Sequence, residues 1–131
     1  MKASATAAQP TFEQGLKEGR LLFQHCTACG VARHPPAPFC AACRSWDASF
    51  RESSGVATLH SFTIVERAAY PGVPVPHIIG LMDMADGVRV IAPVRMNGEP
   101  RIGMAMRACF DTLPPSTLNL LFEPAATGGD G

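Results

Sequence analysis

The chain has 131 residues, of which 47% are hydrophobic, and its 11 basic and 11 acidic residues give a formal net charge of zero. A chain of this length can build one ordinary core, or a small core beside a module held together by metal. With zero net charge, the sequence lacks the excess of basic residues that is expected of a protein that binds nucleic-acid phosphates. The sequence has no apolar stretch near the ~18 residues of a membrane span and no signal-peptide core, so we expect a cytoplasmic protein.

A short helix is predicted near the N-terminus. Thr11 and Gln14 have the spacing of an N-cap and its capping-box partner, and Pro10 disfavours helix before them. The pattern predicts a helix over residues 12–18, ended by a glycine. Residues 20–25 then alternate as a strand that leads to the first cysteine.

Two Cys-x-x-Cys pairs follow, Cys26 with Cys29 and Cys40 with Cys43. Each pair can aim two thiolates at one ion from a tight turn, and two pairs complete a tetrahedral site with no open position for chemistry. Gly30 suits the positive φ that such a turn needs. The spacer between the pairs is short, contains three prolines and favours a rubredoxin-like ribbon. The sequence therefore predicts one structural zinc ion bound by the four thiolates.

Three other chemistries use the same arrangement of cysteines. Two disulfides are disfavoured because nothing indicates export to an oxidising compartment. A redox Cys-x-x-Cys is expected within a βαβ pattern, which the surrounding sequence lacks. Mononuclear iron stays an alternative because the same four sulfurs would hold it, although zinc is the default for four thiolates without a further redox signature.

A run rich in β-branched and aromatic residues begins at Gly55, after a polar segment over 46–54 that we expect to be irregular. The change in composition places a boundary near Ser53. We therefore expect a helix and ribbon domain over 11–53 and a second domain over 54–124.

Turn residues divide the second domain into five strands. Asp86-Gly87 predicts a hairpin between strands over 78–84 and 88–94, and two further strands are predicted over 104–111 and 117–122. Such a set favours a small barrel, because closure removes the exposed edges of a short antiparallel sheet. An OB-fold barrel fits best, with an SH3-like barrel as the nearest alternative. The predicted fold is mostly β: a short N-terminal helix, a rubredoxin-like zinc ribbon and a five-stranded OB-fold barrel.

The order of these motifs resembles one known family. The series runs through a Gly-x-Leu-Leu strand, Cys-x-x-Cys-Gly, a proline-rich hairpin and a second Cys-x-x-Cys. The barrel segments that continue the match are Ser54-Gly55, His60 to Val65, Gly87 to Val90, Arg101 to Met104 and Leu121 to Pro124. The chain resembles the DUF35 family, zinc-ribbon and OB-fold proteins that accompany thiolase-like enzymes, over residues 12–124.

The resemblance implies a role as an accessory subunit. Such a subunit does not contribute the nucleophile; it binds a thiolase, an acyltransferase or a steroid side-chain aldolase in a hetero-oligomer and helps to position an acyl-CoA substrate. The resemblance transfers no catalytic motif to this sequence, so we assign no catalytic residue. Two alternatives remain, a single-stranded nucleic-acid binding module and a rubredoxin-like electron carrier.

The residues themselves also indicate no independent catalyst, which would need a nucleophile with a base or paired titratable groups. Cys109 lies in an alternating strand and is expected to be a small core residue. His25 and His34 lie near a metal site that four cysteines already fill, so we expect surface or supporting positions. His60 and His77 are expected to be satisfied or exposed polar residues.

Contacts to a partner or to acyl-CoA are predicted at two places. The segment over 70–77 contains three prolines and should form an exposed loop that presents Tyr70, Val73 and Val75. A loop folded over the barrel is the alternative. Trp46, the single tryptophan, is expected to pack the ribbon against the barrel or against a partner.

Overall fold

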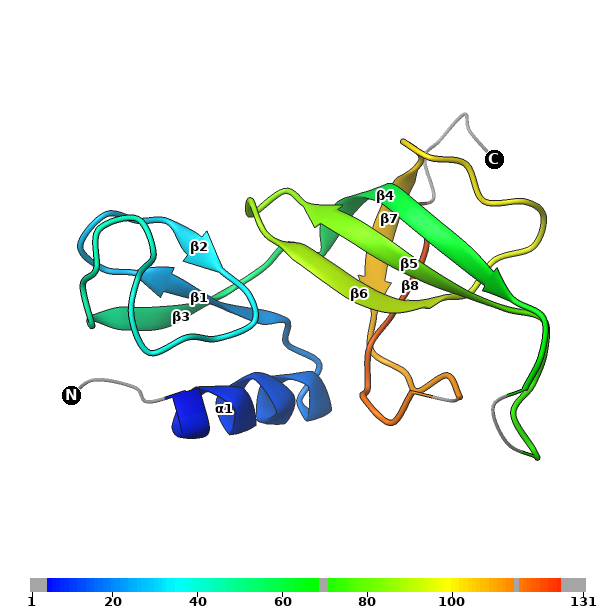
Figure 1. Cartoon of the computed structure of the whole chain (residues 1–131), viewed down its shortest axis with the longest axis horizontal. Helices are drawn as coiled ribbons and strands as arrows, with labels where there is room; N and C mark the ends of the chain where they lie inside the picture. The colour runs from blue at the N-terminus through cyan, green and yellow to red at the C-terminus, as the bar shows by residue number, and fades with distance from the viewer. Residues whose placement is uncertain (1–4, 69–70, 115, 126–131) are drawn as a thin grey trace.

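A computed structural model describes residues 5–68, 71–114 and 116–125 of the protein. A three-stranded sheet with a helix beside it occupies one end of the molecule, and a closed five-stranded barrel occupies the other (Figure 1). In the described part of the chain, no helix is long and apolar enough to cross a membrane.

The N-terminal helix α1 spans Ala5–Lys17 and begins earlier than the sequence predicts. The expected N-cap at Thr11 is therefore wrong, and the helix continues through Pro10, because the alanine-rich residues ahead of it have a high helix propensity. Phe12 and Leu16 lie one turn apart and are almost completely buried. They form the face that packs α1 onto the rest of the molecule.

The ribbon sheet contains β1 (Leu22–Cys26), β2 (Ala32–Arg33) and β3 (Ala48–Glu52), in the order β2-β1-β3. Strand β3 pairs with the whole length of β1, so the expectation of an irregular segment over 46–54 is wrong. The sequence hides this strand because most of its side chains are exposed or half-buried and polar residues suit them. The alternation of Ala48 and Phe50 with polar neighbours is too short to predict a strand, and pairing with β1 defines β3.

The barrel contains β4 (Val56–Val65), β5 (His77–Met84), β6 (Arg89–Val94), β7 (Ala105–Cys109) and β8 (Leu121–Pro124). The strands close in the order β4-β5-β6-β8-β7, with β6 and β8 parallel and the other neighbours antiparallel. This five-stranded arrangement confirms the OB-type barrel. The hairpin predicted at Asp86-Gly87 is also confirmed, because Gly87 adopts a φ of 97° between β5 and β6.

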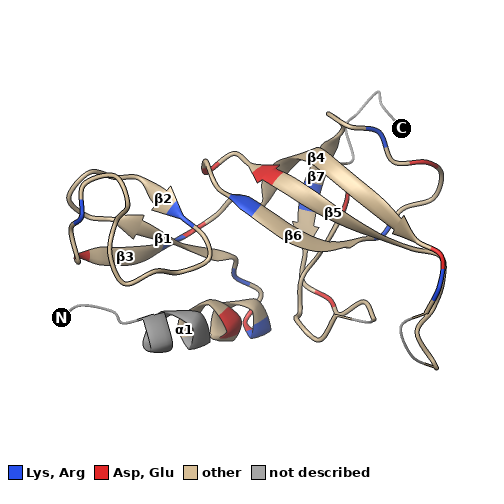
Figure 2. Cartoon of the chain, viewed as in Figure 1, with Lys and Arg blue, Asp and Glu red and all other residues tan. Residues whose placement is uncertain are grey.

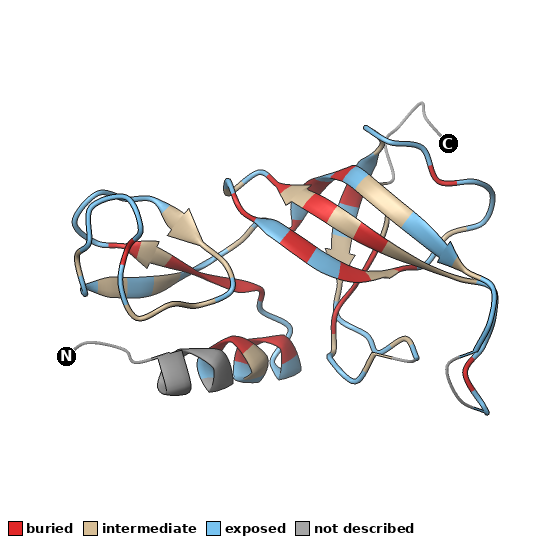
Figure 3. Cartoon of the chain, in the orientation of Figure 1, coloured by how far each residue is buried: buried red, intermediate tan, exposed pale blue. Residues whose placement is uncertain are grey.

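Buried side chains from the helix, the ribbon and the barrel form one hydrophobic cluster. Phe12 of α1 and Phe23 of β1 belong to the same cluster as Met106 and Phe122 of the barrel. Figure 3 shows the same alternation of buried and less buried positions along β5 and β6 that the sequence pattern predicts. The ribbon and the barrel therefore share buried contacts across their junction.

Two hydrogen bonds support this junction. The side-chain amide of Asn119 donates to the Leu16 carbonyl at 2.8 Å, which joins the segment before β8 to α1. The Ser53 hydroxyl donates to Asp86 at 2.6 Å, which joins the connection after β3 to the β5–β6 turn. Both bonds link parts of the chain that are distant in sequence.

Candidate metal centre and surrounding surfaces

The four cysteines that the sequence predicts as ligands come together at one end of the ribbon. Their sulfur atoms all lie within 4.8 Å of one another. The Cys26 and Cys43 sulfurs are 3.5 Å apart, and the Cys29 and Cys40 sulfurs are 3.6 Å apart. Tetrahedral zinc with a Zn–S distance of about 2.3 Å separates its sulfurs by about 3.8 Å. The arrangement is therefore positioned to bind one zinc ion.

Each cysteine pair is held by the same backbone turn. In the first, the Gly30 N–H donates to the Cys26 carbonyl at 2.8 Å; in the second, the Arg44 N–H donates to the Cys40 carbonyl at 2.7 Å. Both donors adopt a positive φ, 82° at Gly30 and 67° at Arg44. The glycine was predicted from the sequence, whereas the arginine at the equivalent position was not.

The electrostatics of the site fit a bound cation. The backbone N–H of Cys29 lowers the pKa of the Cys26 thiol to about 6, and the N–H of Cys43 lowers the pKa of Cys40. The Ser45 N–H also lowers the pKa of Cys43. The Cys26 sulfur, burial and the other two cysteines raise this pKa by more, so it reaches about 12. Four thiolates at this spacing repel one another, and a divalent cation is what allows all of them to ionise together.

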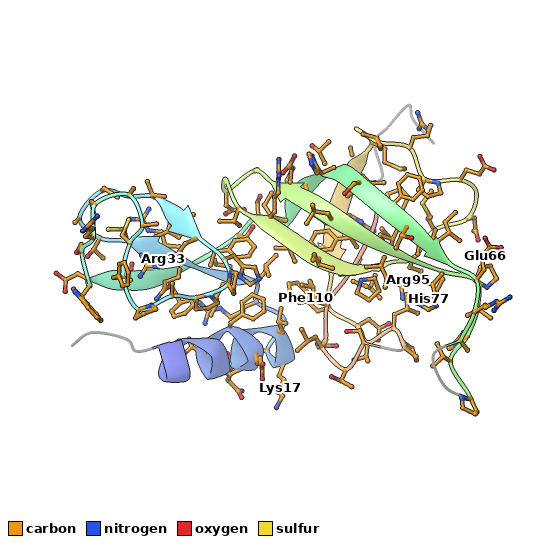
Figure 4. The ribbon with its side chains drawn as sticks, viewed as in Figure 1. Lys17, Arg33, Glu66, His77, Arg95 and Phe110 are labelled. Atoms are coloured by element: carbon orange, nitrogen blue, oxygen red, sulfur yellow. The ribbon has the colours of Figure 1, made fainter. Side chains whose placement is uncertain are left out.

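A polar network ties the proline-rich spacer to β1. Gln24 is almost fully buried, and its side-chain oxygen accepts hydrogen bonds from Arg33 Nε and from the Ala37 N–H, both at 2.8 Å. Arg33, labelled in Figure 4, also donates to the Ala37 carbonyl at 3.1 Å. Sequence reasoning missed Gln24, whose one signal is that it falls on the same face of β1 as the buried Leu22 and Cys26. The network fixes the spacer that separates the two cysteine pairs.

The histidines near the ribbon are more buried than the sequence suggests. His34 packs against the rings of Phe12 at 4.8 Å and Phe23 at 5.4 Å, and burial lowers its pKa. Both ring nitrogens of His25 are buried, with no hydrogen-bond partner among the described residues. Of the two expected alternatives, the surface position is therefore wrong for both residues, since Phe12 and Phe23 pack against His34 and the ring nitrogens of His25 are buried. The supporting position stays a prediction.

The remaining histidines and the fifth cysteine do not form a nucleophile and base. His60 lies 3.2 Å from Asp83, and His77 Nδ1 lies 3.0 Å from the Pro74 carbonyl. Burial and the hydrogen bond to Glu123 raise the pKa of the Cys109 thiol. An activated thiol nucleophile requires the opposite shift.

The predicted contact residues have different outcomes. Tyr70 lies outside the described residues. Val73 is only 8% exposed, so the expectation that it is presented to a partner is wrong, whereas Val75 is 42% exposed. Trp46 is 50% exposed, and its ring lies 5.6 Å from the ring of Phe39 within the ribbon. Trp46 therefore does not pack the ribbon against the barrel, and contact with a partner remains its predicted role.

A cleft of about 660 Å³ opens between the ribbon and the barrel. Arg33 and His34 line it from the ribbon, and Asp83 and Arg89 line it from the barrel. Arg89 donates to Asp83 at 2.6 Å, and this contact holds the pKa of that carboxyl below its usual range. The cleft is open, and its lining combines these polar side chains with the apolar side chains of Ala32, Met84 and Val88.

Comparison with known proteins agrees with this architecture. Residues 14–47 match the family model described as the rubredoxin-like zinc ribbon domain of ChsH2, and residues 50–111 match that of the C-terminal OB-fold domain of ChsH2. The chain belongs to the ChsH2 (DUF35) family. The family description supports zinc as the bound metal, in agreement with the four sulfurs of the site.

Two curated relatives of this ChsH2-family chain are subunits of hydratases. It is 30% identical over 86% of its length to a probable enoyl-CoA hydratase alpha subunit of Thermomonospora curvata. It is 32% identical over 90% of its length to the 3-oxo-4,17-pregnadiene-20-carboxyl-CoA hydratase alpha subunit of Mycobacterium tuberculosis. The chain spans 36% and 38% of the lengths of these two relatives.

Two solved structures resemble the ChsH2-family chain. The Ltp2-ChsH2(DUF35) aldolase contains a chain that superposes with a TM-score of 0.82 at 26% identity, covering 91% of this chain and 95% of that one. A DUF35 protein of unknown function from Sulfolobus solfataricus superposes with a TM-score of 0.65 at 18% identity, covering 88% and 84% of the two chains, and supports the fold alone. The relatives with named activities are thus subunits of enzymes, which supports a role with an enzyme partner.

Proposed function

We propose that the chain is a non-catalytic accessory subunit that binds a thiolase-like enzyme, namely a thiolase, an acyltransferase or a steroid side-chain aldolase, and helps to position its acyl-CoA substrate. The observation that supports this most strongly is the match with the chain of the Ltp2-ChsH2(DUF35) aldolase, which is similar over 95% of its length. Because this likeness covers 91% of this chain as well, it includes the ribbon and the barrel together and not one motif alone.

The chemistry of the described residues favours an accessory role over a catalytic one. The four metal ligands are cysteines, which leaves no open position at the ion for substrate. Cys109 has a raised pKa, and His60 is paired with Asp83 instead of a nucleophile. The acyl-CoA role draws support from the two relatives named as subunits of CoA-thioester hydratases.

In this proposal the ribbon and the loop before β5 provide the contacts. Trp46 and Val75 are exposed apolar side chains on segments that metal ligation or prolines stiffen, and Tyr70 belongs to the same proline-rich loop as Val75. Stiff segments lose little conformational entropy on binding, so more of the burial energy appears as affinity.

The test is reconstitution with the enzyme that would be the partner. The chain is co-expressed with a candidate thiolase-like enzyme from the same organism, and the pair is separated by size-exclusion chromatography. We expect a stable hetero-oligomer and a higher kcat/KM for the acyl-CoA substrate than the enzyme shows alone. Separate elution of the two proteins, with unchanged enzyme activity, would contradict the proposal.

A further inference from the structure

The zinc ribbon contains the same turn twice, once around Cys26 and once around Cys40. In both, the N–H of the first cysteine donates across the turn: Cys26 to the Val31 carbonyl and Cys40 to the Ser45 carbonyl, each at 2.9 Å. The residues that flank the first turn, His25 and Ala32, are paired across β1 and β2. The corresponding residues of the second turn are Phe39 and Trp46, as the printed sequence shows.

The two copies have different surroundings. The ring nitrogens of His25 are buried, and Ala32 packs against the hydrophobic cluster. Phe39 and Trp46 are instead 44% and 50% exposed, with their ring centroids 5.6 Å apart. The ribbon forms one end of the molecule (Figure 1), and its turn regions are mainly exposed (Figure 3). An aromatic pair at this place stabilises little of the fold that the structure describes.

A second departure from the first turn occurs at Arg44. Its φ of 67° lies in the left-handed region, which glycine adopts freely and which other residues adopt only with strain. Gly30 occupies the same position of the first turn, so the fold of the turn does not require a side chain there. Arg44 is exposed and takes part in no ion pair among the described residues. A strained, unpaired charge of this kind points to a function outside the fold.

We propose that Phe39, Arg44 and Trp46, here called the ribbon tip, form the surface that holds the partner enzyme. This inference rests on the proposed function and names the surface and its chemistry. Trp46 and Phe39 would enter an apolar depression of the enzyme, and the Arg44 guanidinium would bind a carboxylate at the edge of that depression. Tryptophan and arginine are the residues most often found to dominate protein interfaces. Because the zinc ligands fix the turn, its side chains are already ordered before binding.

A second exposed apolar surface lies on the barrel and offers the main alternative. Ile79 and Ile91 line two shallow depressions of about 240 and 300 Å³ on the outer face of β5 and β6. Figure 2 shows the middle of these strands without charged residues. Among its described residues, this face has no non-glycine residue with a positive φ and no unpaired charge that would specify an occupant. It therefore serves as the comparison surface in the test.

The experiment measures the affinity of four variants for the thiolase-like enzyme by isothermal titration calorimetry, with zinc content and Tm recorded for each. Trp46→Ala should raise the dissociation constant by about 30-fold or more, and Arg44→Gly should raise it by about 10-fold. Arg44→Gly should keep one equivalent of zinc and should not lower Tm, because glycine relieves the strain at this φ. A residue that served only the fold would not combine an unchanged or higher Tm with weaker binding.

Two matched controls separate the ribbon tip from the barrel. Arg101→Ala removes an exposed arginine from the barrel, and Ile91→Ala shortens a side chain that is 73% exposed. Both should bind within about twofold of the wild type. Binding by Trp46→Ala and Arg44→Gly within twofold of the wild type would overturn the inference while leaving the accessory role intact, as would a loss confined to Ile91→Ala. Absence of binding by the wild type would instead overturn the proposed function itself.

Discussion

The ribbon and the barrel reach a defined structure by different means. In the ribbon, two of the four metal ligands, Cys29 and Cys43, are exposed, and the turns that hold them depend on backbone hydrogen bonds and on the ion. In the barrel, alternate side chains of each strand fill a common interior, as Val90, Ala92 and Val94 do on β6. The ribbon is therefore recognisable from ligand spacing, and the barrel from hydrophobic alternation.

The same comparison shows where the two regions depend on each other. Phe23 belongs to the ribbon strand β1, yet it is fully buried in the cluster that also contains Phe122 of the barrel. The ribbon thus contributes to a core that the hydrophobic alternation of the sequence would assign to the barrel alone. The following predictions test how far each region can be changed without the other.

The largest effect is expected from loss of a metal ligand. Cys40→Ser should reduce the zinc content from one equivalent to less than half and unfold the ribbon, because metal binding supplies roughly 10–16 kcal/mol to the folding of such modules. Metal analysis and circular dichroism measure the two effects. Cys109→Ser is the matched control and should retain the full equivalent. Wild-type zinc content in Cys40→Ser would show that Cys40 is not a ligand.

The next largest effect concerns the barrel without the ribbon. A fragment over residues 51–124 should retain the circular dichroism of a β-sheet, because the alternation that fills the barrel lies within it. Its Tm should nevertheless fall below that of the full chain, since the fragment lacks Phe12, Leu16 and Phe23 of the shared cluster. Thermal unfolding followed by far-ultraviolet circular dichroism is the measurement. Loss of cooperative unfolding would mean that the two regions share one indivisible core.

A single substitution at the junction should have an intermediate effect. Phe23→Ala removes a fully buried ring and should lower the free energy of unfolding by about 3–5 kcal/mol. Zinc release and the barrel signal in a urea titration should shift together, because the ring belongs to a cluster that spans both regions. Val56→Ala, at a position 55% exposed, should cost less than about 0.5 kcal/mol. A shift in zinc release alone would place Phe23 outside the barrel core.

The smallest predicted effect is a pH dependence from His34. Burial lowers its pKa in the folded state, so the unfolded chain binds the proton more readily. The stabilising contribution of the neutral ring is therefore complete above the ordinary histidine pKa of about 6.5 and is lost as the pH falls through the lower folded value.

Thermal unfolding between pH 5 and pH 7.5, a window of about one to two units around that value, measures this dependence. His34→Phe keeps an aromatic ring between Phe12 and Phe23 and should flatten the profile. Zinc content is followed at each pH, since protonation of the cysteines also releases metal. Equal slopes for the wild type and His34→Phe would assign the acid sensitivity to the metal site alone.

Several features follow from the sequence because they depend on local chemistry. The Cys-x-x-Cys spacing predicts the zinc site, since two residues between thiols are enough to form the turn. Asp86-Gly87 predicts the β5–β6 hairpin, since few residue pairs adopt its backbone conformation. The alternation after Gly55 predicts the barrel strands, because every second side chain must face the interior.

Other features were decided only by the tertiary structure, because they depend on neighbours distant in the chain. Strand β3 exists because β1 offers its edge, and the alternation of its own five residues is too short to predict it. Gln24 and His34 are enclosed by the proline-rich spacer and α1, so their burial is not visible in the sequence around them. Val73 is buried although its loop is rich in proline. Phe39 and Trp46 are exposed although both are aromatic, because exposure depends on which other segments lie beside the second zinc turn and not on the residues within it.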